Sequence, residues 1–305
     1  MSADAPLDTR LTEQRNPASE DIDRLDPTAI VDLINEQDAQ VAPAVGAERE
    51  SIALALEFAE EAFRTGGRLI YVGAGTSGRL GVLDASEMPP TYGTDPEMVQ
   101  GIIAGGYEAL VRAKEGAEDH PEDGAAAVEE RGVGEKDFVL GVATSGTTPY
   151  VHGALRRAAE LGARTGLLLC THPAPEYRER YDVVIAPLVG PEVITGSTRM
   201  KAGTATKMVL NTITTGAMIR SGKVFGNLMV DLQVTCQKLQ DRGERILMEM
   251  LSLDREEARE LLDSAGGSVK TAIAMSRTGL DAAGARERLA EAGGRLAAVT
   301  GEPEG

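Results

Sequence analysis

The sequence predicts an α/β fold, a doubly wound and mainly parallel sheet flanked by helices, followed by a small C-terminal helical bundle. Short apolar runs alternate with helical patterns through the middle of the chain, which is the order that α/β folds require. Glycine-rich turns follow several of these runs. We therefore expect an N-terminal extension and helix over residues 1–45, a sheet domain over 46–245 and a C-terminal helical subdomain over 246–305.

The elements of the sheet domain follow in chain order. A short helix is expected from about Pro27, and a longer one carries apolar residues from Ile52 to Phe63 at helical spacing before Gly66 and Gly67 end it. A helix after the first strand should run to about Glu87, where Pro89 and Pro90 would end it. The expected strands are "RLIYVG" (68–73), "MVQGIIAGG" (98–106), the start of "DFVLGVATSG" (137–146), "RTGLLLCT" (164–171) and "DVVIAPL" (182–188).

Further helices are expected between and after these strands. The segments 107–119 and 121–132 read as helices, as does 148–163 after the third strand. Beyond the segment 190–203 the chain should be helical to about Arg242. The tail holds three short helical patterns divided by glycines, "LDREEARELLDSAGG", "SVKTAIAMSRTG" and "LDAAGARERLAEAGGRL".

Composition excludes several functional classes. The formal net charge of −17 repels nucleic acid and anionic membranes, and aromatic residues make up only 3% of the chain. The sequence has no apolar leader at its start and no run long enough to span a membrane. Its two cysteines and three histidines form no metal-binding motif. We expect a cytoplasmic protein without a metal or cofactor, and without a nucleic-acid or membrane partner.

The first glycine-rich turn could bind either a dinucleotide or a single phosphate. Gly73, Gly75 and Gly78 form G-x-G-x-x-G directly after an apolar strand, as in dinucleotide sites. A dinucleotide site also needs an acidic residue at the tip of the second strand, and "IIAGG" has none there. Thr76 and Ser77 instead add hydroxyl donors to the amides at a helix N-terminus, which favours a phosphate.

A second turn of the same kind follows the third strand. The segment "ATSGTTP" carries Ser145, Gly146, Thr147 and Thr148 ahead of Pro149, which suits a first helical turn. Serine and threonine are also common helix caps without any ligand. Because the carboxyl ends of parallel strands meet at one edge of a sheet, the two turns together predict a phosphate site.

These turns resemble the phosphosugar-binding loops of sugar isomerase (SIS) domains. The segment "GPEVITGSTRMKAGTATKMVLN" (190–211) is more specific, because it resembles the signature shared by the glucokinase regulatory protein family and bacterial N-acetylmuramic acid 6-phosphate etherases. The resemblance extends from Leu11 to about Ala298, and the length of the chain suits the etherases, since the regulatory protein carries two such domains. Further matches to the etherases are "TEQRNPAS" (12–19), "LDASEMPPTYG" (83–93) and "EGAED" (115–119).

The resemblance implies an SIS-type fold and a lyase reaction. Etherases of this family remove the D-lactyl group of N-acetylmuramate 6-phosphate, giving N-acetylglucosamine 6-phosphate and D-lactate in cell-wall sugar recycling. The implied route is elimination from the open-chain sugar followed by addition of water, without a metal or cofactor. The resemblance also implies a homodimer with shared active sites.

Candidate catalytic residues follow from the same matches. Glu87 matches the family's proton donor to lactate, and Glu118 matches the second acid, which we expect to remove the proton at C2. Phosphate or carboxylate contacts are expected from Gly75, Thr76, Ser77, Ser145, Gly146, Thr147, Thr148, Ser197, Arg199 and Lys201. The cations of the segment 190–211 could instead pair with acids across a subunit interface.

Three other functions share parts of this pattern. A regulatory protein that senses a sugar phosphate would keep the signature segment, and an aldose–ketose isomerase would keep the C2 base. An NAD-dependent dehydrogenase fits least, because the second-strand acid is missing. The expected helix separates Ser77 from Glu87 by about 15 Å. Either this helix is shorter or kinked, or Glu87 serves a substrate held by a partner subunit.

Overall fold

A computed structural model describes residues 10–232, 234 and 236–301 of the chain. The chain divides into two compact units, each of which is described by itself. The first, here called the sheet unit, comprises residues up to Glu87 together with Pro96–Thr214. The second, the helical unit, comprises Met88–Asp95 and the residues from Thr215 onward.

A five-stranded, fully parallel sheet forms the centre of the sheet unit. Its strands are β1 (Leu69–Gly73), β2 (Val99–Ile103), β3 (Phe138–Val142), β4 (Arg164–Leu168) and β5 (Val183–Ile185). They lie in the order β2-β1-β3-β4-β5, and Gly73 is in register with Ile103 on one side and Val142 on the other. All five expected strands are therefore confirmed, and with them the doubly wound, parallel α/β fold.

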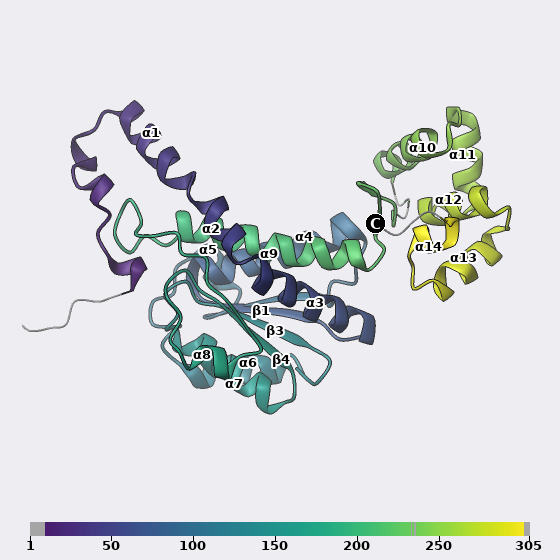
Figure 1. Cartoon of the computed structure of the whole chain (residues 1–305). Helices are drawn as coiled ribbons and strands as arrows, with labels where there is room; N and C mark the ends of the chain where they lie inside the picture. Colours follow the sequence, from purple (N-terminus) through teal and green to yellow (C-terminus); the bar gives the residue numbers. More distant parts are fainter. Residues whose placement is uncertain (1–9, 233, 235, 302–305) are drawn as a thin grey trace, which may run out of the picture. The chain divides into compact units, whose positions relative to one another are not determined.

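Helices cover both faces of the sheet (Figure 1). The helices α6 (Pro121–Glu130), α7 (Pro149–Glu160) and α8 (Tyr177–Arg180) lie on one side, and α3 (Arg49–Thr65), α4 (Gly75–Tyr92) and α9 (Lys201–Arg220) lie on the other. Alternate strand residues serve the two cores: Ile70 and Val72 pack with α7, while the side chains of Leu69 and Tyr71 are buried on the opposite face. The N-terminal part adds three 3-10 turns (Leu11–Glu13, Pro17–Ser19 and Ile22–Arg24), α1 (Pro27–Asp38) and α2 (Val41–Ala47).

A buried carboxylate fixes α4 to its neighbours. Asp84 Oδ2 accepts a hydrogen bond from the Tyr71 hydroxyl of β1 at 2.9 Å, and Oδ1 accepts from Thr214 of α9 at 3.2 Å and from the Asn211 side-chain amide. Burial raises the pKa of Asp84, and these donors oppose that shift. The contacts hold α4 against both β1 and α9.

The structure corrects the predicted end of α4. The helix does not stop before the two prolines but continues to Tyr92, with Pro89 and Pro90 in its last turn. Each proline lacks an N–H, yet its carbonyl can still accept, and the amide of Gly93 donates to the Pro89 carbonyl at 2.9 Å. The expected helix is therefore longer than predicted, and Glu87 lies inside it.

The predicted helix over residues 107–119 is also wrong. Only α5 (Glu108–Val111) is helical there, and residues 115–118 form a turn. Gly116 has a φ of +75°, a left-handed conformation that helices exclude and glycine permits. The acidic segment is thus presented on a turn rather than on a helix face.

The helical unit contains the tail helices. Its helices are α10 (Gln237–Leu251), α11 (Arg255–Ser264), α12 (Val269–Thr278), α13 (Ala282–Glu291) and α14 (Leu296–Thr300). Val269 and Ile273 of α12 lie in an apolar core with Leu247 and Leu262. Before α10, a small antiparallel hairpin of β6 (Val224–Phe225) and β7 (Leu228–Met229) interrupts the stretch that we expected to be helical to Arg242.

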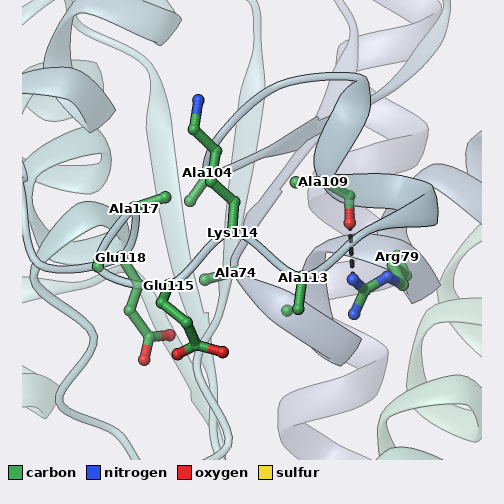
Figure 2. A pocket seen from close by; sticks show the side chains of 11 residues that line it. Ala74, Arg79, Ala104, Ala109, Ala113, Lys114, Glu115, Ala117 and Glu118 are labelled. Atoms are coloured by element: carbon green, nitrogen blue, oxygen red, sulfur yellow. Dashed lines mark hydrogen bonds between the residues drawn. The ribbon is translucent and has the colours of Figure 1, made fainter.

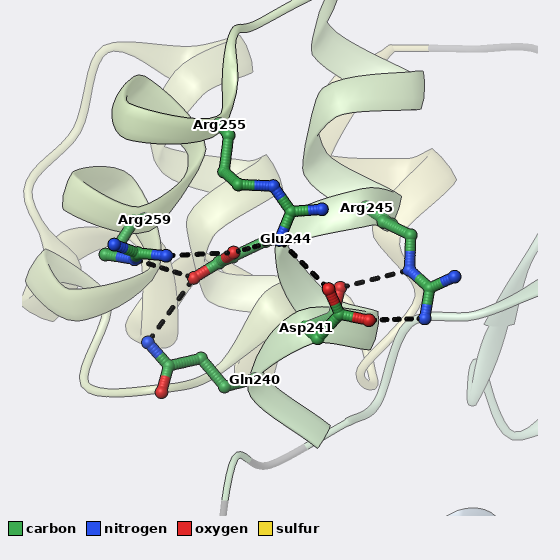
Figure 3. Close-up of polar contacts among 6 residues, drawn as sticks. All are labelled: Gln240, Asp241, Glu244, Arg245, Arg255 and Arg259. Atoms are coloured by element: carbon green, nitrogen blue, oxygen red, sulfur yellow. Dashed lines mark hydrogen bonds and ion pairs between the residues drawn. The ribbon is translucent and has the colours of Figure 1, made fainter. Parts of the chain in front are cut away.

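An ion-pair network joins α10 to α11 (Figure 3). The carboxylate of Glu244, of which 1% is exposed, accepts from Arg259 Nε at 2.8 Å and from Arg255 Nη1 at 2.9 Å. Arg255 also pairs with Asp241 at 2.9 Å. The hydrogen bond from Arg259 is the largest cause that lowers the pKa of Glu244.

Candidate active site

The order of the strands creates a crevice at the carboxyl edge of the sheet. From β1 the chain crosses to β2 on one side, and after β2 it returns to β3 on the other side of β1. The turns that follow β1 and β3 therefore diverge around one point, where open parallel sheets bind their ligands. Both predicted phosphate turns lie at this edge, because they directly follow β1 and β3.

Each glycine of the first turn has a separate steric reason. A Cβ on Gly73 would lie 2.7 Å from the Gly78 nitrogen, and one on Gly78 would lie 2.8 Å from the Gly73 carbonyl oxygen. Gly75 has a φ of +51° and faces open space. The first turn of α4 can therefore pack against the end of β1, and its N-terminal amides and partial positive charge reach the crevice. Thr76 is half-buried and Ser77 is buried in this turn.

The second turn is held by hydrogen bonds to one carbonyl group. Gly146 has a φ of +77°, and its carbonyl accepts from His152 Nε2 at 2.8 Å and from the Tyr177 hydroxyl at 2.8 Å. Ser145 and Thr147 contact each other through their hydroxyl oxygens at 3.3 Å. Thr148 precedes α7 as its N-cap residue. Two donors from α7 and α8 thus orient the Gly146 carbonyl, and the Thr147 hydroxyl oxygen accepts a hydrogen bond from Arg10 Nη1 at 3.0 Å.

A pocket beside the first turn collects acidic and basic side chains (Figure 2). Gly75 and Arg79 contribute from α4, and the segment after β2 contributes Lys114, Glu115 and Glu118. In Figure 2 the carboxylates of Glu115 and Glu118 point the same way, and the guanidinium of Arg79 lies on another side of the pocket. The remaining lining residues are small: Ala74, Ala104, Ala109, Ala113, Gly116 and Ala117.

The turn that carries Glu118 is attached to α7, the helix that follows the second phosphate turn. The Glu118 carbonyl accepts a hydrogen bond from the Tyr150 amide at 3.0 Å, which satisfies an otherwise free donor in the first turn of α7. The Asp119 amide donates to the Gly116 carbonyl at 3.2 Å and closes the turn. Glu118 is thus fixed through its backbone to the helix that follows Thr148, while its side chain lines the pocket.

Glu87 lies apart from these residues. It is exposed on α4 and is not among the residues that line the pocket. Because α4 is continuous from Gly75 to Tyr92, the helical rise separates Gly75 from Glu87 by about 18 Å along the axis. A shorter α4, one of the expected explanations for the distance to Glu87, is therefore excluded.

The three candidates of the signature segment occupy different environments. Ser197 is half-buried and Arg199 is exposed, and neither lines the pocket beside α4. Lys201 is 2% exposed, and its ammonium donates to Gln37 Oε1 at 3.1 Å. Burial is the largest cause that lowers the pKa of Lys201, and the nearby Glu192 opposes it.

Glu192, within the signature segment, has a structural role at the start of α9. Its carboxylate accepts from the backbone amides of Lys201 at 3.0 Å and Ala202 at 2.9 Å, so it caps the N-terminus of α9. Burial raises the pKa of Glu192, and the two amides oppose the shift. Glu192 and the Lys201 side chain thus anchor α9 and the N-terminal segment, a structural function that the sequence did not reveal.

The sequence also left two pocket residues unassigned. Arg79 follows Thr76 by one helical turn, so its position beside the first phosphate turn could have been inferred from helical spacing. Lys114 lies in an irregular stretch directly before the turn at residues 115–118, and no local sequence pattern marks it. Over residues 10–232, 234 and 236–301, no cluster of histidine, cysteine and acidic side chains is arranged to hold a metal. No helix in the same residues is long and apolar enough to cross a membrane.

Comparison with known proteins agrees with this description. Residues 51–159 match the family described as the glucokinase regulatory protein N-terminal SIS domain. An N-acetylmuramic acid 6-phosphate etherase of Synechococcus elongatus is 56% identical over 95% of this chain and 94% of its own length. One from Aliivibrio fischeri is 52% identical over 90% of this chain and 92% of its own. A phosphoheptose isomerase from Neisseria gonorrhoeae superposes with a TM-score of 0.48 at 16% identity, covering 62% of this chain and 97% of its own.

Proposed function

The chain belongs to the N-acetylmuramic acid 6-phosphate etherases, which are carbon–oxygen lyases, and from this premise we propose how its residues divide the reaction. The reaction splits the D-lactyl ether of N-acetylmuramate 6-phosphate into N-acetylglucosamine 6-phosphate and D-lactate. The observation that carries the proposal is that Gly75, at the start of the first phosphate turn, and Glu118 line one pocket.

The phosphate binds at the carboxyl edge of the sheet, between the two turns. The amides at the N-terminus of α4 and the hydroxyls of Thr76 and Ser77 donate from one side. Ser145, Gly146, Thr147 and Thr148 donate from the other side. The net charge of −17 opposes the binding of an anion, so the phosphate depends on these local N–H and O–H donors.

Glu118 acts as the base in the first step. The open-chain sugar carries an aldehyde at C1, which makes the hydrogen at C2 acidic. Glu118 removes this proton, the C2–H electrons form the C2=C3 double bond, and the C3–O bond to the lactyl group breaks.

The alternatives of a regulatory protein or an isomerase are not favoured, because the relatives that match almost the whole chain are named as etherases.

Glu87 acts as the acid that protonates the departing lactyl oxygen. D-Lactate then leaves, and a water molecule adds its hydroxyl to C3 and its proton to C2, which restores a saturated sugar. Neither step changes an oxidation state or needs an electron carrier, so we infer that no cofactor takes part.

We also infer that the enzyme acts in the cytoplasm, where a free thiol such as that of Cys170 is stable.

The two acids come from different subunits in this proposal. Glu87 lies about 18 Å along α4 from Gly75, farther than one hexose phosphate extends. The face of α4 that carries Glu87 also exposes Leu83, a residue that is 53% exposed and is suited to a subunit contact. We infer a homodimer in which Glu87 of each subunit reaches the substrate bound by the other.

The test of the reaction is release of D-lactate from N-acetylmuramate 6-phosphate in a metal-free buffer. Purified wild-type protein should release D-lactate, and Glu118→Gln and Glu87→Gln should each reduce the rate by about 10³-fold or more, because each removes a proton-transfer group. In deuterated water, Glu118→Gln should also abolish exchange at C2, whereas Glu87→Gln can retain it.

Two matched variants serve as controls. Asp119→Asn changes the exposed acid next to Glu118, and Glu57→Gln changes an exposed acid of α3; both should keep the wild-type rate within about twofold. Tight binding of the sugar phosphate without any release of D-lactate by the wild type would contradict the lyase assignment. Release at the wild-type rate by either glutamine variant would contradict the role given to that residue.

A further inference from the structure

The substrate of the proposed reaction carries a second anion that the phosphate turns do not neutralise. Besides the phosphate, N-acetylmuramate 6-phosphate has the carboxylate of its lactyl group. A carboxylate that loses water on binding requires charge-assisted hydrogen bonds, and the strongest donor geometry is the planar fork of an arginine. The pocket also contains Glu115 and Glu118, which would repel an unpaired carboxylate.

The cations that the sequence suggested for this role are not in the pocket. Lys201 donates its ammonium to Gln37 in a buried network, and Arg199 is exposed without lining the pocket. The pocket instead contains Arg79 and Lys114. In Figure 2 the Lys114 ammonium points away from the carboxylates of Glu115 and Glu118.

Arg79 is held in a fixed position by backbone carbonyls. Its Nε donates to the Leu110 carbonyl at 3.0 Å and its Nη2 donates to the Ala109 carbonyl at 2.7 Å, at the end of α5. These acceptors are neutral, so they orient the guanidinium without cancelling its charge. A guanidinium has five N–H donors, which leaves donors for a ligand. Orientation before binding reduces the entropy lost when a ligand is bound.

We propose that Arg79 binds the lactyl carboxylate and so makes the enzyme specific for the ether over its sugar product. This inference rests on the proposed function, because it assigns a group of that substrate. The product N-acetylglucosamine 6-phosphate has the same phosphate but lacks the lactyl group. Loss of Arg79 therefore weakens binding of the substrate and leaves binding of the product largely unchanged.

The test compares two ligands across three variants. Arg79→Met keeps the length of the side chain and removes its charge, Arg79→Lys keeps the charge without the fork, and Arg112→Met removes an exposed cation nearby that does not line the pocket. For each, KM is measured with N-acetylmuramate 6-phosphate and the inhibition constant with N-acetylglucosamine 6-phosphate. We expect Arg79→Met to raise KM about 10- to 100-fold and the inhibition constant less than about twofold.

The controls separate the specific role from a structural one. Arg79→Lys should raise KM by an intermediate factor, and Arg112→Met should change neither constant by more than about twofold. Equal weakening of both ligands by Arg79→Met would overturn the proposal, since it would indicate a phosphate contact or displacement of α5. An unchanged KM would overturn it as well. If wild-type protein released no D-lactate, the proposed function itself would fail, which is a separate result.

Discussion

At the scale of single residues, two hydrogen-bond donors fix the orientation of one carbonyl group in the second predicted phosphate turn. The Gly146 carbonyl oxygen can only accept, so His152 Nε2 must carry the proton that it donates there. In the neutral ring Nδ1 then accepts from the Tyr181 hydroxyl, 2.6 Å away. Burial is the largest cause that lowers the pKa of His152, which keeps the ring in this neutral form at pH 7.

We expect His152→Ala to weaken phosphate binding more than it slows the chemical step. The substitution removes one of the two donors to Gly146, and a lost hydrogen bond of this kind should raise KM by about 3- to 10-fold. Steady-state kinetics with N-acetylmuramate 6-phosphate and inhibition by inorganic phosphate measure the effect. His172→Ala, which changes an exposed histidine, is the control. A fall in kcat with an unchanged KM would show that this turn does not bind the phosphate.

At the scale of elements, the sequence predicts most where the signal is local. Each strand of the sheet is a short apolar run between polar or glycine-rich turns, and buried parallel strands require such runs. The course of α4 past Pro89 could not be predicted, because its continuation depends on packing rather than on propensity. The turn around Gly116 also depends on a distant contact, the hydrogen bond from Tyr150 to Glu118.

The pairing of α10 with α11 should make the helical unit sensitive to acid. The arginine contacts lower the pKa of Glu244 in the folded state, so the unfolded state binds more protons as the pH falls. The stabilisation is complete above the unfolded pKa and is lost as the pH falls through the lower folded pKa. At pH 7, Glu244→Gln should reduce the melting temperature of this unit by about 5 °C, and the difference from wild type should shrink toward pH 3.

Calorimetry over this pH range tests the prediction. The exposed Glu287 of α13 provides a control, since Glu287→Gln should melt like the wild type at each pH. A difference between Glu244→Gln and wild type that stays constant from pH 7 to pH 3 would mean that the charge of Glu244 does not stabilise the unit.

At the scale of the whole molecule, sequence patterns indicate which residues are candidates but not which of them meet. The exception is the pair of turns that carry Thr76 and Ser145, which could be assigned to one edge of the sheet because they follow the neighbouring parallel strands β1 and β3. Arg199 and Lys201 are close in sequence, but only Lys201 is buried, and it holds the N-terminal segment through Gln37. Such contacts join residues more than a hundred positions apart, so spacing along the chain carries no information about them.

The distance between Glu87 and the pocket yields a test of how subunits share the reaction. In a symmetric dimer with exchanged acids, each site combines Glu118 of one subunit with Glu87 of the other. A heterodimer of one Glu87→Gln subunit and one Glu118→Gln subunit, purified through two different tags, then retains one intact site. It should show about half of the wild-type activity, although both homodimers are inactive.

A second heterodimer gives the opposite result and completes the argument. When one subunit carries both substitutions and the other carries none, exchanged acids leave no intact site, so the activity should fall to the level of the inactive homodimers. If both acids act within one chain, this second heterodimer keeps about half of the activity and the first keeps none. Because the two arrangements reverse the ranking of the same two preparations, differences in expression or folding between variants cannot imitate either outcome.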